Sequence, residues 1–126
     1  MSGGAWEYVA CYVNNGHGNL TNYGSSLVNG DAKTKNVYSK ASSDSYENNY
    51  NANSSKYGDA VYETSTNGSG STSWYGDYSS FPHTDWPFFN RGGGYSNGTG
   101  AGVLYFSYNN GNSYGSISFR PVLVAL

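Results

Sequence analysis

The sequence predicts an α+β fold, with one main helix, several short strands and a large share of irregular backbone. Residues 43–60 carry the capping residues and the ring spacing that favour a helix. Residues 103–108 and 116–119 are short runs of strand-forming side chains. Glycine, serine and asparagine fill most of the remaining segments, which is typical of loops and turns.

The first apolar run, Ala5 to Val13, fits either a buried strand or a short helix. Turn-forming residues at positions 14–19 end this run. Residues 23–36 show weak periodicity and are predicted to be mostly loop. Asn36 to Ser39 can form a short extended piece.

The helix is predicted within residues 43–60. Ser43 or Asp44 can cap its N-terminus, and Glu47 stands near the capping-box position. Gly58 ends it. Three tyrosine rings fall on one stripe of this helix, at Tyr46, Tyr50 and Tyr57.

Residues 60–64 are predicted to form a short strand, and residues 65–73 a loop without packing residues. Between residues 74 and 89, aromatic residues alternate with turn formers. Pro82 and Pro87 exclude both a helix and a central strand from this segment.

Two strands are expected in the last part of the chain, near residues 103–108 and 116–124. The turn formers Asn109 to Asn112 join them. Because Asn-Gly is a strong hairpin signal, the two strands are predicted to pair with each other.

The amino-acid composition excludes several classes of protein. A chain of 126 residues supports one domain over residues 1–126. Charged residues are 11%, the net charge is −2 and there is no basic patch, so no nucleic-acid partner is expected. The aromatic content of 17% argues against disorder. No stretch is apolar enough to predict direct membrane insertion.

Cysteine and histidine offer little catalytic chemistry. Cys11 is the only cysteine, which excludes an intrachain disulfide, and its apolar neighbours favour a small core residue. His17 and His83 lie in separate loops, and the His83-Thr84-Asp85 segment resembles a surface loop more than a metal site. No nucleophile constellation is present.

Arg91 and Arg120 are the only arginines, and each stands at the edge of an apolar run. A planar guanidinium with five fixed donors suits a partly buried structural position, so both are predicted to hold loops in place. We expect Trp6, Phe119 and Arg91 to be largely buried, and Arg91 to satisfy backbone carbonyls.

Three blocks of the chain are distinctive: residues 1–9 (Met-Ser-Gly-Gly-Ala-Trp-Glu-Tyr-Val), 89–93 (Phe-Asn-Arg-Gly-Gly) and 116–122 (Ser-Ile-Ser-Phe-Arg-Pro-Val). In this order they resemble the Met-x-Gly-Asn-Val-Trp-Glu-Trp, Arg-Gly-Gly-Ser-Trp and Gly-Phe-Arg blocks of the formylglycine-generating (sulfatase-modifying factor) enzyme family. The resemblance implies a C-type-lectin-like core with short strands and long irregular loops. The chain is also similar to retroelement variable proteins, which share that core, and to C-terminal domains of bacterial pilin-like proteins.

The family resemblance implies an extracellular, cell-surface or virion protein, and residues 1–126 are expected to be the C-terminal part of a longer one. The enzyme family holds copper with two cysteines near its C-terminus, and residues 90–126 contain none. The domain is therefore expected to be non-catalytic and to need no cofactor. The resemblance also implies a calcium site at Glu7 with carbonyls of Gly3 or Ala5. The alternative for Glu7 is a pair with Arg91 or Arg120.

The favoured function is a ligand-binding or display module for a protein or glycan, because rigid rings mixed with Ser, Asn and Gly are typical of recognition loops. The alternatives are a structural subunit of a pilus or virion and a degenerate oxidase. Trp86 is the expected anchor, although a core position for it is nearly as plausible. The predicted binding residues are Trp74, Tyr75, Tyr78, Phe81, His83, Trp86, Tyr95, Tyr105, Tyr108 and Tyr114.

Overall fold

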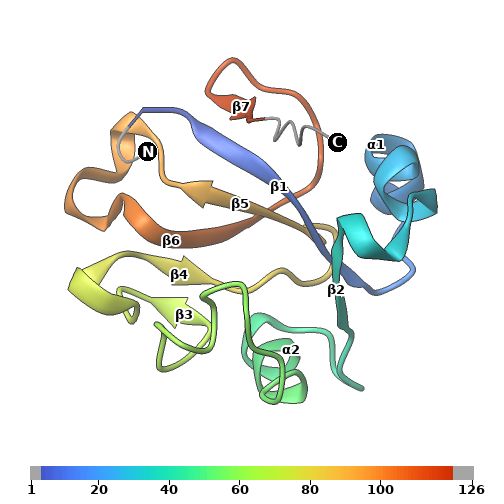
Figure 1. Ribbon diagram of the computed structural model, residues 1–126, viewed down its shortest axis with the longest axis horizontal. Coiled ribbons are helices and arrows are strands. Elements are labelled where there is room, and N and C mark those ends of the chain that lie inside the picture. The colour runs from blue at the N-terminus through green and yellow to red at the C-terminus, as the bar shows by residue number, and fades with distance from the viewer. Residues whose placement is uncertain (1–3, 121–126) are drawn as a thin grey trace.

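One seven-stranded sheet organises residues 4–120, the part of the chain that the computed structural model describes (Figure 1). The strand order is β2-β1-β5-β6-β4-β3, and β7 also pairs with β1. The strands are β1 (Trp6–Asn14), β2 (Asn36–Ser39), β3 (Ser69–Gly70), β4 (Ser79–Ser80), β5 (Phe88–Gly92), β6 (Gly102–Asn109) and β7 (Ile117–Phe119). The helices are α1 (Gly18–Asn29) and α2 (Tyr46–Ala52), with 3-10 turns η1 (Ala32–Thr34), η2 (Trp74–Gly76) and η3 (Tyr95–Gly100).

The α+β prediction is confirmed, and so are several of its elements. The first apolar run is a strand, and the extended piece at residues 36–39 is β2, which runs parallel to β1. The strand expected at residues 60–64 is wrong: this segment is a turn in which Ala60 has a φ of +62°. No helix within residues 4–120 combines the length and the apolar character that crossing a membrane requires.

Helix α1 contradicts the loop predicted for residues 23–36, and it is longer than α2, the helix found in the range predicted for the main helix. Its sequence is poor in strong helix formers, so local propensity hides it. Leu20 and Leu27 nevertheless pack against the sheet, and this tertiary contact stabilises the helix. His17 caps it, since His17 Nδ1 accepts a hydrogen bond from the Asn19 N–H at 3.2 Å.

Helix α2 lies within the predicted range but covers only seven residues. Its cap is Ser45, whose hydroxyl accepts from the Asn48 N–H at 3.3 Å. Tyr50 is buried as expected, whereas Tyr57 follows the helix and is 69% exposed. Asn53 docks the helix on β2: its amide accepts from the Ser39 N–H and donates to the Ser39 carbonyl.

The predicted C-terminal hairpin is wrong. Strand β6 has β5 on one edge and β4 on the other, so no edge remains for β7. Strand β7 instead runs parallel to the start of β1, with Trp6 opposite Ile117. Strand β1 therefore gives one edge to β5 and the other to β7 and β2. Positions 121–124 of the expected strand lie outside the described residues.

The alternation of side chains along the strands divides the core into two faces. On the α2 face, eight buried residues form the larger cluster: Cys11, Val13, Tyr38, Tyr50, Val61, Phe81, Phe89 and Phe106. On the α1 face, Tyr12 and Phe88 pack with Leu20 of the helix. The side chains of consecutive residues such as Phe88 and Phe89 thus pack on opposite faces of the sheet.

Glycines make room for aromatic rings at several close contacts. A Cβ on Gly24, where α1 departs from helical geometry, would lie 2.5 Å from the Phe88 ring. A Cβ on Gly111 would lie equally close to the same ring, and one on Gly94 would lie 2.7 Å from the Trp6 ring. The backbone at these glycines therefore packs directly against the rings.

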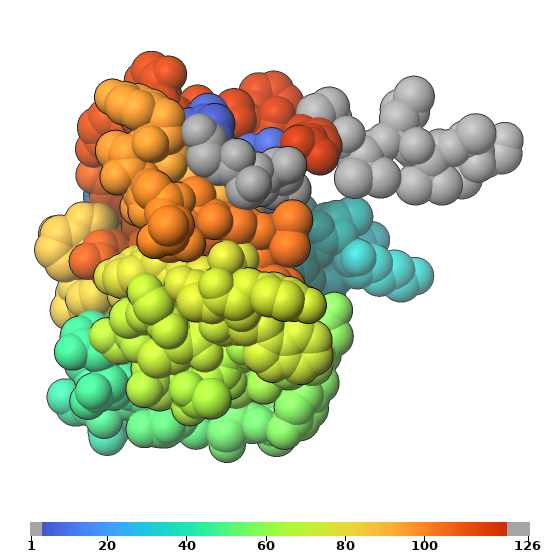
Figure 2. All heavy atoms as spheres, turned by 90° about the vertical axis from the view of Figure 1, so that its left-hand side faces the viewer, coloured from blue at the N-terminus to red at the C-terminus, as the bar shows by residue number. Residues whose placement is uncertain are grey.

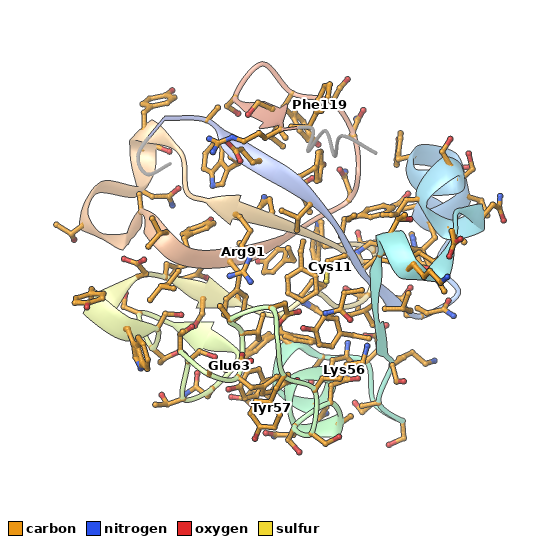
Figure 3. All side chains as sticks on the ribbon, viewed as in Figure 1. Cys11, Lys56, Tyr57, Glu63, Arg91 and Phe119 are labelled. Carbon is orange, nitrogen blue, oxygen red and sulfur yellow. The ribbon has the colours of Figure 1, made fainter. Side chains whose placement is uncertain are left out.

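The four residues predicted to be structural have mixed outcomes. Arg91 donates to the Asp59 carbonyl, which confirms the expected backbone contact. Arg91 and Trp6 are partly exposed, with most of the surface of each residue buried, as predicted. Phe119 is 76% exposed, which contradicts the prediction, because β7 is an edge strand; Figure 3 shows it far from Arg91 and Cys11. Arg120 is exposed and pairs with Glu7.

The segment over residues 65–73 is a loop as predicted, but it is better packed than its composition suggests. Ser65 and Ser73 are buried, and it contains the short strand β3. Figure 2 shows the side of the molecule where residues 60–80 and residues 95–105 lie against each other. The Tyr78 N–H donates to the Gly100 carbonyl at 2.9 Å across this boundary.

Candidate functional site

The structure corrects two of the ten predicted binding residues. Phe81 has no exposed surface and Tyr105 is 3% exposed, so neither ring can form a surface contact with a ligand. Phe81 sits in the α2-face core, against the rings of Tyr38 and Phe89. An aromatic-rich sequence leaves few aliphatic residues for the core, and these rings take their place.

Three other predicted residues, His83, Trp86 and Tyr108, come together at the surface. The His83 ring lies 4.9 Å from that of Tyr108 and 5.6 Å from that of Trp86, measured between centroids, and the Trp86 and Tyr108 rings are 5.4 Å apart. Tyr46 of α2 joins them, with its ring 5.6 Å from His83. We call His83, Trp86, Tyr108 and Tyr46 the His83 cluster.

A tight turn presents two of these rings. The His83 N–H donates to the Trp86 carbonyl at 3.2 Å, and the Trp86 N–H donates to the His83 carbonyl at 2.9 Å. Between them, Thr84 has a φ of +46°, a conformation that a β-branched residue rarely adopts. Buried prolines, Pro82 and Pro87, precede and follow the turn. Backbone strain of this kind persists only where its surroundings enforce it.

Three asparagine side chains hold the turn in this strained conformation. The Asn15 amide donates to the Thr84 carbonyl at 2.6 Å, and the Asn19 amide donates to the Asp85 carbonyl at 2.7 Å. Asn49 of α2 donates to the Pro82 carbonyl at 3.1 Å. The turn is thus tied to both helical regions, which fixes the position of the rings.

An open groove of about 510 Å³ runs beside the turn. It is lined by Asn15, Gly16, His17, Asp44, Thr84 and Asp85. Amide, carboxylate and hydroxyl groups therefore border the His83 cluster directly. Tyr46 and the asparagine contacts had no signal in the sequence, because they depend on how α1 and α2 pack beside the turn.

The remaining predicted rings lie elsewhere. Trp74 and Tyr75 stand on η2 and are 59% and 92% exposed. Tyr78 stacks on the buried Tyr105, with 5.9 Å between ring centroids. Tyr95 begins η3 and is 78% exposed, whereas Tyr114 borders a separate pocket near Trp6. The ten residues therefore do not form one continuous face.

No metal centre stands out in the part of the chain that the structure describes, since no three His, Cys, Asp or Glu side chains lie close enough together to share an ion. Glu7 accepts from Arg120 Nη2 at 2.9 Å, which is one of the two arginine pairs expected for it. Calcium binding by Glu7 remains a prediction from the resemblance. Gly3, one of its expected partners, lies outside the described residues.

Cys11 lies in the core beside a polar network. The Asp59 carboxylate accepts from the Tyr38 hydroxyl and the Asn36 amide, and Arg91 contacts the Asp59 backbone. Burial raises the pKa of the Cys11 thiol well above its ordinary value, and the nearby Asp59 charge adds to this effect. Burial also lowers the pKa of the Arg91 guanidinium. The thiol is therefore poorly suited to nucleophilic chemistry.

In the folded protein, Cys11 is expected to react with a thiol reagent at neutral pH at least roughly tenfold more slowly than in urea, because both its thiolate fraction and its accessibility are reduced. The measurement is the rate of reagent consumption with and without denaturant. Equal rates in the two conditions would contradict a buried thiol.

Comparisons with known proteins add no assignment: no family model, no curated protein and no solved structure matches the chain.

Proposed function

We propose that this domain is a non-catalytic binding or display module that recognises an extracellular protein or glycan through the His83 cluster. The observation that carries the proposal is the strained turn at Thr84, which three asparagine amides hold in place while it presents His83 and Trp86. Strain maintained at the surface by dedicated contacts is typical of recognition sites.

The rings of the His83 cluster are preorganised for binding. Trp86 is 38% exposed and packs on Tyr108 and His83, so its ring loses little conformational freedom when it contacts a ligand. Aromatic rings of this kind are the usual anchors of binding surfaces. The polar groove beside the turn supplies hydrogen-bond donors and acceptors that orient the ligand.

The proposal extends to the architecture and the setting. We propose a C-type-lectin-like core and a place on a bacterial surface or a phage appendage. Two observations support the proposed core. Strands β1 and β7 pair, which brings the Trp-Glu block beside the Phe-Arg block, and Glu7 meets Arg120 there. Glu7 also lies opposite Arg91 of the third block, on β5.

Replacing Trp86 by alanine is expected to weaken ligand binding at least roughly tenfold, the loss of about 1.4 kcal/mol that a central ring commonly supplies. The measurement is a glycan and protein array followed by titration of any ligand found. Trp74→Ala is the matched control, because Trp74 is an exposed tryptophan outside the His83 cluster. Equal binding by a folded Trp86→Ala protein, or no binding by the unmodified protein, would overturn the proposal.

A further inference from the structure

A small pocket of about 230 Å³ borders Trp6, the first residue of β1. This end of β1 lies away from α1 (Figure 1). We propose that the pocket binds a single neutral sugar ring, at a site that shares Tyr108 with the His83 cluster but none of the cluster's other residues. We call it the Trp6 pocket. Its lining residues are Trp6, Asn90, Tyr105, Ser107, Tyr108, Asn109, Tyr114, Ser116 and Ile117.

The pocket is built mainly on strands. Trp6 comes from β1, Asn90 from β5, and Tyr105 and Ser107 from β6, and in the sheet register Asn90 lies directly opposite Ser107. Sites on paired strands are positioned more precisely than sites on loops. The segment leading to β7 closes the remaining side, with Tyr114 48% exposed at the rim.

The chemistry of the lining restricts the ligand to a neutral molecule. None of the nine lining residues carries a charge at neutral pH. An ionised ligand would lose its hydration in this pocket without gaining a countercharge, which is strongly unfavourable. Hydroxyl and amide groups are instead plentiful, so the pocket favours a ligand rich in hydrogen-bond donors and acceptors.

Asn90 has a side-chain oxygen that lacks a hydrogen-bond partner among the described residues. The residue is 3% exposed. The neighbouring Tyr8 hydroxyl cannot serve, because it donates to Asn109 at 2.8 Å and faces the Asn112 carbonyl at 2.9 Å. Buried amide oxygens are nearly always paired. This oxygen has no accessible surface of its own, so a half-turn of the amide, which exchanges its oxygen and nitrogen, must bring it to the pocket before a donor from outside the chain can reach it. A sugar hydroxyl is such a donor.

Trp6 supplies the apolar wall. Its indole N–H donates to the Tyr105 hydroxyl at 3.0 Å, and its ring lies against Gly94. The ring is therefore fixed before any ligand arrives. A sugar ring combines an apolar C–H face with hydroxyls at its edge, which matches an aromatic wall beside an unpaired amide. The volume lies below the roughly 300–1,000 Å³ of sites for drug-sized ligands, which suits one ring.

The test is a titration of the ¹⁵N-labelled protein with neutral hexoses and N-acetylhexosamines to high millimolar concentration. At least one sugar is expected to shift the Asn90 amide and Trp6 indole resonances in a saturable manner. If no sugar shifts them, or if the shifts do not saturate, the proposal is overturned.

Asn90→Leu is the decisive variant, because leucine fills a similar volume without a polar group. It is expected to weaken sugar binding at least roughly tenfold, while the unfolding midpoint stays unchanged or rises because an unpaired polar atom is removed. Asn48→Leu, at an exposed position of α2, is the control. Retained binding by a folded Asn90→Leu protein would overturn the proposal. Trp86→Ala is expected to weaken this binding less than Asn90→Leu does, because Trp86 packs on Tyr108 but does not itself line the Trp6 pocket.

Discussion

Replacing Phe81 by alanine is expected to lower the free energy of unfolding by about 3–5 kcal/mol, the usual cost of removing a buried phenylalanine ring. Phe81 has no exposed surface, and its ring contacts those of Tyr38, Tyr50 and Phe89 at centroid distances of 5.1, 5.8 and 5.2 Å. The cavity would open at the centre of the larger core cluster, where the surrounding rings cannot easily collapse. Urea denaturation followed by tyrosine fluorescence measures the change.

The matched control is Tyr75→Ala, which removes an aromatic ring of similar size that is 92% exposed. This variant should unfold within about 0.5 kcal/mol of the unmodified protein. If both substitutions had the same small effect, the burial of Phe81 in the core would be wrong. Any binding lost by Phe81→Ala is expected to return under conditions that restore folding.

Gly111→Ala is expected to cost roughly 2–5 kcal/mol, of which about 1–3 kcal/mol comes from overpacking and about 1–2 kcal/mol from backbone strain. The added Cβ would lie 2.5 Å from the Phe88 ring and 2.7 Å from the Tyr23 Cβ. Gly111 also has a φ of +97°, which side chains disfavour. The unfolding midpoint in urea gives the change.

Gly115→Ala is the control for this substitution. A Cβ at Gly115 would meet no heavy atom within 4 Å, and the position lies in the same segment between β6 and β7. Its stability should therefore stay within about 0.5 kcal/mol of the unmodified protein. A Gly111→Ala protein as stable as Gly115→Ala would show that Phe88 can move aside.

The sequence predicted elements wherever local residue patterns decide the outcome. The apolar run that includes Cys11, expected to be a strand or a short helix, is a strand, and the short extended piece after residue 35 is β2. Helix α1 could not be predicted this way, because it depends on Leu20 reaching the sheet. The hairpin at Asn109 failed for a related reason: strand pairing depends on which edges are free, and β4 and β5 had occupied both edges of β6.

The candidate site, like the fold, could be predicted only in part from the sequence. Trp86, His83 and Tyr108 were predicted from composition, and the structure brings them together. Phe81 and Tyr105 belong to the same compositional class but are buried, so residue type alone could not separate core rings from surface rings. Asn90 gave no sequence signal, because its missing donor is a property of the assembled sheet.

The pairing of β1 with β5 and β7 also governs how quickly the protein can fold. Glu7 must find Arg91, and the Trp6 indole must find the Tyr105 hydroxyl, which lies 99 positions further along the chain. Such distant partners close large loops, and domains dominated by them fold in milliseconds to seconds. On the ribosome, β1 emerges first but has only the four-residue β2 beside it until β5 follows. Until then its apolar side chains lack most of their partners, and exposed apolar surface of this kind is prone to aggregate.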